Sequence, residues 1–432
     1  MRCNMLNVKS FLRSEYSQRL TGRDLEDFKW LTRIFPFKVS PYVLDNLINW
    51  EDYPNDPIYR LVFPVREMLT EAHWRLLQSA NGRAAEQAAI NTIRRELNPH
   101  PGGQKKNIPT LKGRPLGGLQ HKYRETVLFF PAAGQTCHSY CSYCFRWAQF
   151  VRMDEHTFKA RDIRDLVAYL KAHTEVTDVL ITGGDPLFMD NELLAVYIDA
   201  LLQPGLSHVL NIRIGTKAPA YYPQRFLDMA GDGFLRLVDK IRRAGKNPAI
   251  MAHYTHPREL ETPLAVQAVQ RLVNAGALLR TQAPLVRPVN SDPEVWATLW
   301  RRQVQLGMIP YYMFVERDTG AHNYFRVPLI RALNIYRQAT ARLSGLAKTV
   351  RGPVMSADPG KVLLDGVLNV GESRYFVLKF LQARDAENIN KVFLAVYDEQ
   401  AAWWDELNVL QLDNAADNRP SEGRAKRIPI KG

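Results

Sequence analysis

The chain has 432 residues, with 57 lysines and arginines against 44 aspartates and glutamates, and a formal net charge of +13. Its 46% hydrophobic and 23% charged fractions are ordinary for a globular protein and exclude a disordered, collagen-like or disulfide-framework chain. No apolar run approaches the ~18 residues that span a bilayer, and the first residues hold no apolar signal segment. We therefore expect a cytoplasmic protein with no membrane partner.

Residues 1–118 are predicted to form a helical extension that ends in an extended wrap. Residues 99–118 contain two stretches rich in proline and glycine, which favour a linker or a wrap over a helix. Apolar residues recur earlier at the spacing of one helix face, at Val65, Met68, Leu69, Ala72 and Leu76.

From residue 126 the pattern alternates between short apolar strands and helical stretches. Such βα units favour a parallel sheet, open or curled into a barrel. Polar motifs follow nearly every strand, and the loops after the strands carry function in such barrels. We therefore expect one large site at one rim. The six strands are expected at residues 126–130, 179–181, 209–214, 250–253, 278–282 and 309–315.

The pattern changes after about residue 345. Residues 346–418 are predicted to form a C-terminal lobe, with a turn at residues 356–361 and strands at residues 375–381 and 392–397. The tail at residues 419–432 has five basic residues and one acidic residue, with proline and glycine, and is predicted to be disordered.

The cysteines are concentrated in one short motif. Of the four in the chain, Cys137, Cys141 and Cys144 fall within eight residues with the spacing C-x3-C-x2-C, and Cys3 stands alone. Neighbours at this spacing are poor disulfide partners and more often bind metal. An iron–sulfur cluster held by three cysteines would leave one iron open to another ligand. A zinc knot with His138 or another side chain as fourth ligand is the alternative that the spacing leaves open.

Two further features accompany this motif. An aromatic residue, Tyr143, precedes the last cysteine, and a glycine-rich turn, Gly183-Gly184-Asp185-Pro186, follows the second expected strand. Together these motifs resemble the radical S-adenosylmethionine superfamily. The resemblance implies a [4Fe-4S] cluster on the three cysteines, whose open iron binds S-adenosylmethionine and splits it to a 5′-deoxyadenosyl radical. It also implies that Tyr143, Gly183, Gly184 and Asp185 contact this cosubstrate.

The superfamily resemblance implies an α/β fold. Its core is a partial (β/α)6 barrel of the radical S-adenosylmethionine type over residues 119–345, between the helical extension and the C-terminal lobe.

A narrower resemblance covers residues 41–361. Blocks at residues 118–123, 183–187, 213–219, 253–257, 310–312 and 325–326 resemble, in order, the lysine 2,3-aminomutase family. This implies an isomerase, a pyridoxal phosphate-dependent amino-acid 2,3-aminomutase. In that family the adenosyl radical removes a β-hydrogen from the amino acid, and the amino group then migrates from carbon α to carbon β.

The family resemblance also assigns roles to single residues. It implies that His253 and Gln282 contact S-adenosylmethionine and that Arg146 pairs with the substrate carboxylate, a role for which a planar guanidinium is well suited. Lys361 is implied to be the catalytic lysine that holds pyridoxal phosphate, which requires a lowered pKa. The implied partners are an amino-acid substrate, an electron donor such as a flavodoxin or ferredoxin, and a second copy of the chain in a homo-oligomer.

The sequence departs from the family in two places. The glycine run before the catalytic lysine is shortened to Asp358-Pro359-Gly360-Lys361, and Thr126 replaces an arginine that helps to hold the cofactor, so the use of pyridoxal phosphate stays open. The family's two aspartates for the distal amine fall on Arg317 and near Ser356 or Asp358. If Arg317 faces the substrate, an acidic amino acid such as glutamate is favoured. A slip of one residue would bring an acidic neighbour in and restore a cationic substrate.

Two alternatives accompany the aminomutase interpretation. One is a radical enzyme that does not use pyridoxal phosphate and acts on another small molecule, a peptide or a protein. The other, from a different class, is a nucleic-acid-binding protein stabilised by zinc or a cluster. The basic charge is spread along the chain and is not interleaved with aromatic residues in one patch, so we do not expect a nucleic-acid partner.

Overall fold

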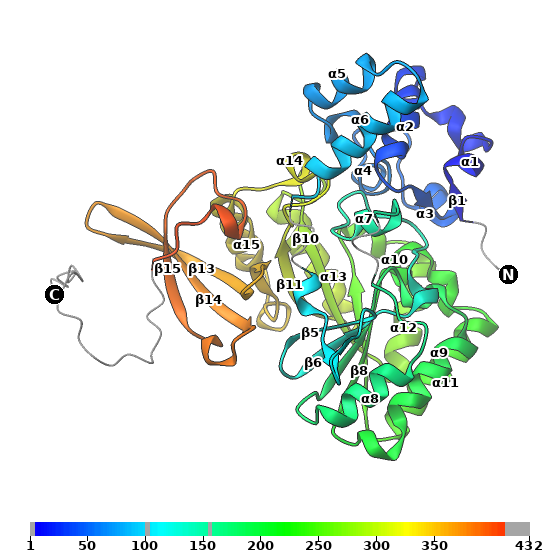
Figure 1. The fold of residues 1–432 in the computed structure, drawn as a ribbon, viewed down its shortest axis with the longest axis vertical. Helices are drawn as coiled ribbons and strands as arrows, with labels where there is room; N and C mark the ends of the chain where they lie inside the picture. Colours follow the sequence, from blue (N-terminus) through cyan, green and yellow to red (C-terminus); the bar gives the residue numbers. More distant parts are fainter. Residues whose placement is uncertain (1–4, 100–103, 154–157, 411–432) are drawn as a thin grey trace.

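The computed structural model describes residues 5–99, 104–153 and 158–410. The tail predicted at residues 419–432 and the lone Cys3 lie outside these ranges. The fold is built on one eleven-stranded sheet in which the strands follow one another in chain order from β5 (Leu119–Tyr123) to β15 (Val392–Val396) (Figure 1).

The middle of the sheet is a run of parallel strands that are connected by helices. The strands are β6 (Thr126–Phe129), β7 (Asp178–Ile181), β8 (Asn211–Thr216), β9 (Asn247–His253), β10 (Leu278–Leu285) and β11 (Ile309–Val315). The main connecting helices are α8 (Arg164–Ala172), α9 (Asn191–Leu202), α11 (Met229–Arg243), α12 (Pro263–Asn274) and α13 (Pro293–Gln305). The sheet does not close, because β5 (Leu119–Tyr123) and β15 lie at its two edges. The α/β class and the partial (β/α)6 barrel are thus confirmed.

Successive side chains along each strand point alternately to the two faces of the sheet, and this decides which of them face the interior. In β8, Ile212 and Ile214 are buried and the intervening Arg213 is only partly buried. Successive side chains of a strand point to opposite faces, so Arg213 faces away from those two isoleucines. The third strand was expected at residues 209–214, but it begins at Asn211.

The N-terminal helices gather at one end of the molecule, beside α7 (Trp147–Phe150) and α10 (Ala218–Tyr221) (Figure 1). Four phenylalanines form their common core, with ring centroids 4.8 to 5.9 Å apart: Phe11, Phe28, Phe37 and Phe63. The helices are α1 (Val8–Phe11), α2 (Gly22–Ile34), α3 (Pro41–Asn46), α4 (Pro57–Val62), α5 (Glu71–Ser79) and α6 (Arg83–Glu96).

The helix face predicted around residues 65–76 is wrong. The helix α5 begins only at Glu71, because Thr70 caps it in a capping box with His73. Its buried face is formed by His73, Trp74 and Leu77, while Leu76 is exposed. The apolar spacing that crossed residue 70 joined a 3-10 turn to a helix of different phase.

The C-terminal strands extend the same sheet away from the helical end (Figure 1). The strand β12 (Arg351–Ser356) pairs parallel with β11, and β13 (Gly360–Val370), β14 (Ser373–Ala383) and β15 (Val392–Val396) continue antiparallel. A second apolar core forms between these strands and α15 (Leu329–Ala341). The strands expected at residues 375–381 and 392–397 are confirmed, and β13 was missed. Lys361 lies in β13 opposite Ser356, just beyond the turn.

No helix in the part of the chain that the structure describes combines the length and apolar character that a membrane span requires.

Candidate active site

The three cysteines lie in the loop between β6 and α7, and the N-terminal extension holds that loop. The Tyr140 amide donates a hydrogen bond to the Lys38 carbonyl at 2.9 Å, and the Ser142 amide donates to the Leu61 carbonyl at 2.8 Å. The Ser40 amide donates to the Ser139 hydroxyl at 2.9 Å. The shape of the cysteine loop therefore depends on residues about 100 positions earlier in the chain.

The three thiols share one environment. Cys137, Cys141 and Cys144 are all free cysteines. Burial raises the pKa of each thiol, to about 12 for Cys144, and neighbouring cysteines raise the pKa of Cys137 and of Cys144 further. Thiols with raised pKa values stay protonated at neutral pH. They lose the proton and become thiolate ligands when a bound cation compensates the negative charge. Within residues 5–99, 104–153 and 158–410, no three His, Cys, Asp or Glu side chains are grouped closely enough to hold a single ion. A [4Fe-4S] cluster is larger than a single ion and is held by cysteine thiolates. The three cysteines of this loop are therefore the donor set that such a cluster requires.

The glycine turn after β7 packs directly on the segment that leads into Cys137. Gly183 has φ +138°, which side chains rarely adopt, and a Cβ on Gly184 would lie 2.4 Å from the Thr136 backbone nitrogen. Beside this turn the buried Gln135 Oε1 has no hydrogen-bond partner among the described residues. An unpaired acceptor at this point suits an amino group, such as that of S-adenosylmethionine.

Replacing Gly184 by alanine is expected to destabilise the protein by about 1–3 kcal/mol, because the new Cβ meets backbone that cannot move without shifting the cysteine loop. Affinity for S-adenosylmethionine should fall in parallel. Thermal unfolding and calorimetric titration measure the two effects. Gly345→Ala is the matched control, since a Cβ there meets nothing within 4 Å. Equal melting temperatures for the two variants would contradict this interpretation of the turn.

The carboxylate of Asp185, a residue predicted to contact the cosubstrate, forms hydrogen bonds within the chain. Its oxygens accept hydrogen bonds from the Thr216 hydroxyl at 2.7 and 2.8 Å, the Lys217 amide at 2.9 Å and the Leu187 amide at 3.0 Å. Burial by itself raises the pKa of Asp185, but the interaction with His138 and the hydrogen bonds from Thr216 and Lys217 outweigh it, and the pKa is lowered. Asp185 thus ties the turn after β7 to the end of β8.

His138, the fourth ligand of the zinc alternative, has other partners. Its Nδ1 lies 3.8 Å from Asp185 Oδ2, and its ring stacks on Tyr222 with centroids 5.0 Å apart. The structure therefore turns this imidazole toward the glycine turn.

His253 and Gln282 lie side by side on β9 and β10, where they are register partners. Their Nε2 atoms are 2.8 Å apart. Burial lowers the pKa of His253 to about 4, and Lys217 lowers it further. The imidazole is therefore neutral at physiological pH and would not repel a positively charged sulfonium.

Tyr143 is held next to this pair by Thr255. Its hydroxyl lies 2.9 Å from the Thr255 hydroxyl, which also accepts a hydrogen bond from Lys217 Nζ at 3.1 Å. Lys217 forms an ion pair with the fully buried Glu259 at 2.7 Å. The structure thus brings Tyr143 and His253 to one side of the rim.

Arg146 carries a buried guanidinium with an unused donor. Its Nη1 has no hydrogen-bond partner among the described residues, and its Cζ lies 4.5 Å from the Phe130 ring centroid and 4.9 Å from that of Phe145. Burial lowers the pKa of Arg146 to about 10, and the charge of Arg317 lowers it further. The group remains charged at neutral pH, and a buried charge without a counter-ion calls for an anion. The site therefore fits a substrate carboxylate.

Lys361 points into the interior between two tyrosine rings. Its Nζ lies 4.7 Å from the Tyr312 ring centroid and 5.5 Å from that of Tyr123. Burial lowers the pKa of Lys361 to about 7, and the charges of Arg213, Arg351 and Lys122 lower it further, in that order. A substantial fraction of this amine is therefore neutral at pH 7. Neutral amine is the nucleophilic form, and the surrounding cations suit a phosphate group.

Lys122 is a second amine in the same interior. Burial lowers its pKa to about 7 as well, with Arg317 and Arg384 adding to the effect. Its Nζ, however, donates a hydrogen bond to the Ala357 carbonyl. Lys122 is therefore the internal competitor that any test of Lys361 must distinguish.

Three groups of this interior were not predicted from the sequence: Gln135, Asp178 and Arg351. Asp178 forms a 2.6 Å ion pair with Arg213 of the neighbouring strand. Asp178 could have been found from the sequence, because it is a charged residue in the otherwise apolar strand β7. Alternation along the strand places such a residue on the face away from the helices. Arg351 of β12 carried no such signal.

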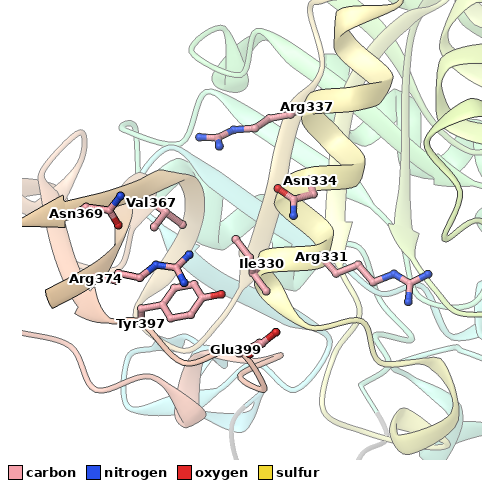
Figure 2. A pocket seen from close by; sticks show the side chains of 9 residues that line it. All are labelled: Ile330, Arg331, Asn334, Arg337, Val367, Asn369, Arg374, Tyr397 and Glu399. Atoms are coloured by element: carbon pink, nitrogen blue, oxygen red, sulfur yellow. The ribbon is translucent and has the colours of Figure 1, made fainter. Parts of the chain in front are cut away.

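A cavity of the described residues lies away from the predicted site. It has a volume of about 600 Å³ and separates α15 from the β13–β14 hairpin (Figure 2). None of the predicted site residues lines it. The lining residues are Ile330, Arg331, Asn334, Arg337, Val367, Asn369, Arg374, Tyr397 and Glu399.

Comparisons with known proteins agree with the geometry of the rim. Residues 133–280 match the family model of the radical SAM superfamily, whose members use a [4Fe-4S] cluster and S-adenosylmethionine. A lysine 2,3-aminomutase relative from Aquifex aeolicus is 30% identical over 404 residues, which cover 93% of this chain and 96% of the relative.

Two further relatives are named for the amino acid on which they act. The L-lysine 2,3-aminomutase of Haemophilus influenzae is 29% identical over 57% of this chain and 68% of its own length. The glutamate 2,3-aminomutase of Clostridioides difficile is 26% identical over 76% of this chain and 67% of its own length. The nearly end-to-end match to the Aquifex relative decides the family. The chain belongs to the lysine 2,3-aminomutase-like family of radical S-adenosylmethionine enzymes.

Proposed function

We propose that this protein is a pyridoxal phosphate-dependent amino-acid 2,3-aminomutase that begins its reaction with a [4Fe-4S] cluster and S-adenosylmethionine. The observation that carries the proposal is the amine of Lys361, whose pKa is lowered to about 7 among four other charged groups in the interior of the barrel. The names of the lysine and glutamate aminomutase relatives support the same reaction class.

Different residues of the interior would bind the cofactor and the substrate. Lys361 offers the neutral amine that reacts with the aldehyde of the cofactor. The cations nearest to it, Arg213 and Arg351, supply positive charge for the phosphate. Arg146 presents its free Nη1 to the substrate carboxylate. Bound pyridoxal phosphate would supply a conjugated ring that delocalises an unpaired electron, which no side chain here can do.

The side of the rim that carries the cysteine loop would bind the cluster and S-adenosylmethionine. The loop of Cys137, Cys141 and Cys144 would hold the cluster, and the turn at Gly183 lies against the segment that leads into this loop. The neutral His253 and its partner Gln282 line the adjoining strand ends. Arg317 interacts electrostatically with both Arg146 and Lys122, and Lys122 with Lys361, so a continuous series of charged groups joins the carboxylate end to the amine.

Borohydride trapping of pyridoxal phosphate tests the proposal. The protein is purified without oxygen, assayed for iron, incubated with pyridoxal phosphate at pH values from about 6 to about 9, reduced and digested for peptide mapping. We expect label on Lys361, with a yield that rises through pH 7, because the neutral fraction of an amine falls about tenfold per pH unit below its pKa.

Two outcomes would overturn this assignment. Label on Lys122, whose pKa is also about 7, would move the cofactor to the other amine. Iron and S-adenosylmethionine cleavage without any trapped label would favour the radical enzyme that does not use pyridoxal phosphate.

A further inference from the structure

Three consecutive charged residues follow β11, and only the structure shows which of them faces the interior. Glu316 is buried with 6% exposure, and burial raises the pKa of its carboxyl well above the ordinary range, with Arg326 as the opposing charge. Arg317 turns the other way, and its Nη2 donates to the Ser356 carbonyl at 2.8 Å and to the Ser356 hydroxyl at 3.3 Å. The residue that reaches the interior is thus the cation.

Arg317 shares an aromatic ring with the group that is proposed to bind the substrate carboxylate. The Arg317 Cζ lies 4.7 Å from the Phe145 ring centroid, and the Arg146 Cζ lies 4.9 Å from the same point. Phe145 is 38% exposed, so the ring between the two guanidiniums borders open space. A small molecule over this ring would meet a guanidinium at each end.

Two carboxylates of this region, Asp358 and Asp178, are already paired with basic side chains. Asp358 forms ion pairs of 3.2 Å with both Lys106 and Arg384. Asp178, deeper in the interior, is paired with Arg213. Asp318 and the Tyr123 phenol favour the charged form of Arg317, but burial outweighs them and lowers its pKa. No ion pair joins Arg317 to a carboxylate in the described part of the chain, and the neighbouring Lys122 adds another basic group.

We propose that the substrate is an acidic amino acid, whose side-chain carboxylate binds Arg317 while its α-carboxylate binds Arg146. The proposal rests on the aminomutase function given above and names its substrate class. A lysine substrate would place its ammonium against Arg317, which forms no ion pair with a carboxylate of the described residues, and like charges at such a contact cost affinity. A dicarboxylate compensates both guanidiniums at once.

The first experiment compares substrates on the loaded enzyme. Glutamate, aspartate, alanine and lysine are each incubated with it, and both β-amino acid product and 5′-deoxyadenosine are measured. We expect kcat/KM for an acidic amino acid to exceed that for lysine by at least about 10²-fold, in line with the loss of a buried charge pair. Preference for lysine or alanine would overturn the substrate class.

Arg317→Met keeps the length of the side chain and removes its charge. We expect kcat/KM for the acidic substrate to fall about 10²-fold, mainly through KM. Arg317→Lys restores the charge and should recover part of the affinity, which also covers the case in which the methionine variant does not fold. Arg331→Met, on an exposed arginine of α15 (Figure 2), is the matched control.

A binding measurement separates this proposal from the proposed function. Glutarate carries two carboxylates and no amine, so calorimetry reports its binding without any turnover. Glutarate that binds the wild type and not Arg317→Met supports the acidic substrate even if no amino acid is isomerised, in which case the aminomutase function alone fails. β-Amino acid formation from lysine, with glutarate binding unaffected by Arg317→Met, would overturn the acidic substrate and leave the function standing.

Discussion

Cys141→Ala is expected to abolish iron binding and to reduce S-adenosylmethionine cleavage to background. The loop between β6 and α7 offers three thiols. A cluster that already lacks a fourth protein ligand should dissociate when one of these three is removed. The Cys141 thiol donates to the Tyr221 hydroxyl at 3.8 Å, a weak contact whose loss should leave the fold intact. The loop backbone is fixed independently by its bonds to the N-terminal extension.

The measurements for this variant are the iron content, the visible absorbance and the yield of 5′-deoxyadenosine under reducing conditions. Cys3→Ala removes the same chemical group outside the loop and should retain all three signals. Substantial cleavage of S-adenosylmethionine by Cys141→Ala would show that the cysteine loop does not hold the cluster.

Lys361→Ala is expected to lower kcat of the isomerisation by about 10²–10⁴-fold, the range for loss of a positioned catalytic group. Cleavage of S-adenosylmethionine should continue, because the thiols and the glycine turn are unchanged. The exposed Lys348→Ala is the control for removal of a lysine. A variant that isomerises its substrate at the wild-type rate would exclude Lys361 as the catalytic lysine.

The same variant should change how stability depends on pH. The pKa of Lys361 is about 7 in the folded protein against 10.5 ordinarily, so between these values the unfolded chain binds more protons. Wild-type stability from this group therefore rises with pH across that window, and the group is most unfavourable below pH 7. We expect the difference in melting temperature between Lys361→Ala and the wild type to shift against the variant as the pH rises from 7 toward 10.5. A difference that does not change with pH would contradict the lowered pKa.

The sequence determined the architecture because its signals are local. Apolar strands that alternate with helical stretches specify a parallel sheet, and six expected strands correspond to β6–β11. The cysteine spacing and the glycine turn are local as well, since a few neighbouring residues must meet one cofactor. The failed helix face at residues 65–76 has an equally local cause, because the capping box at Thr70 overrides the apolar spacing.

Only the tertiary structure decided the chemistry of the interior. One residue of register decides whether Arg317 or its acidic neighbours face the substrate, since adjacent side chains at a strand end point in opposite directions. The amine of Lys361 becomes nucleophilic because the fold buries it, and because β8 and β12 bring Arg213 and Arg351 beside it. The sequence determined which chemical groups the protein has. The fold alone decided their pKa values and partners, because burial and charge act through space between residues that are far apart in the chain.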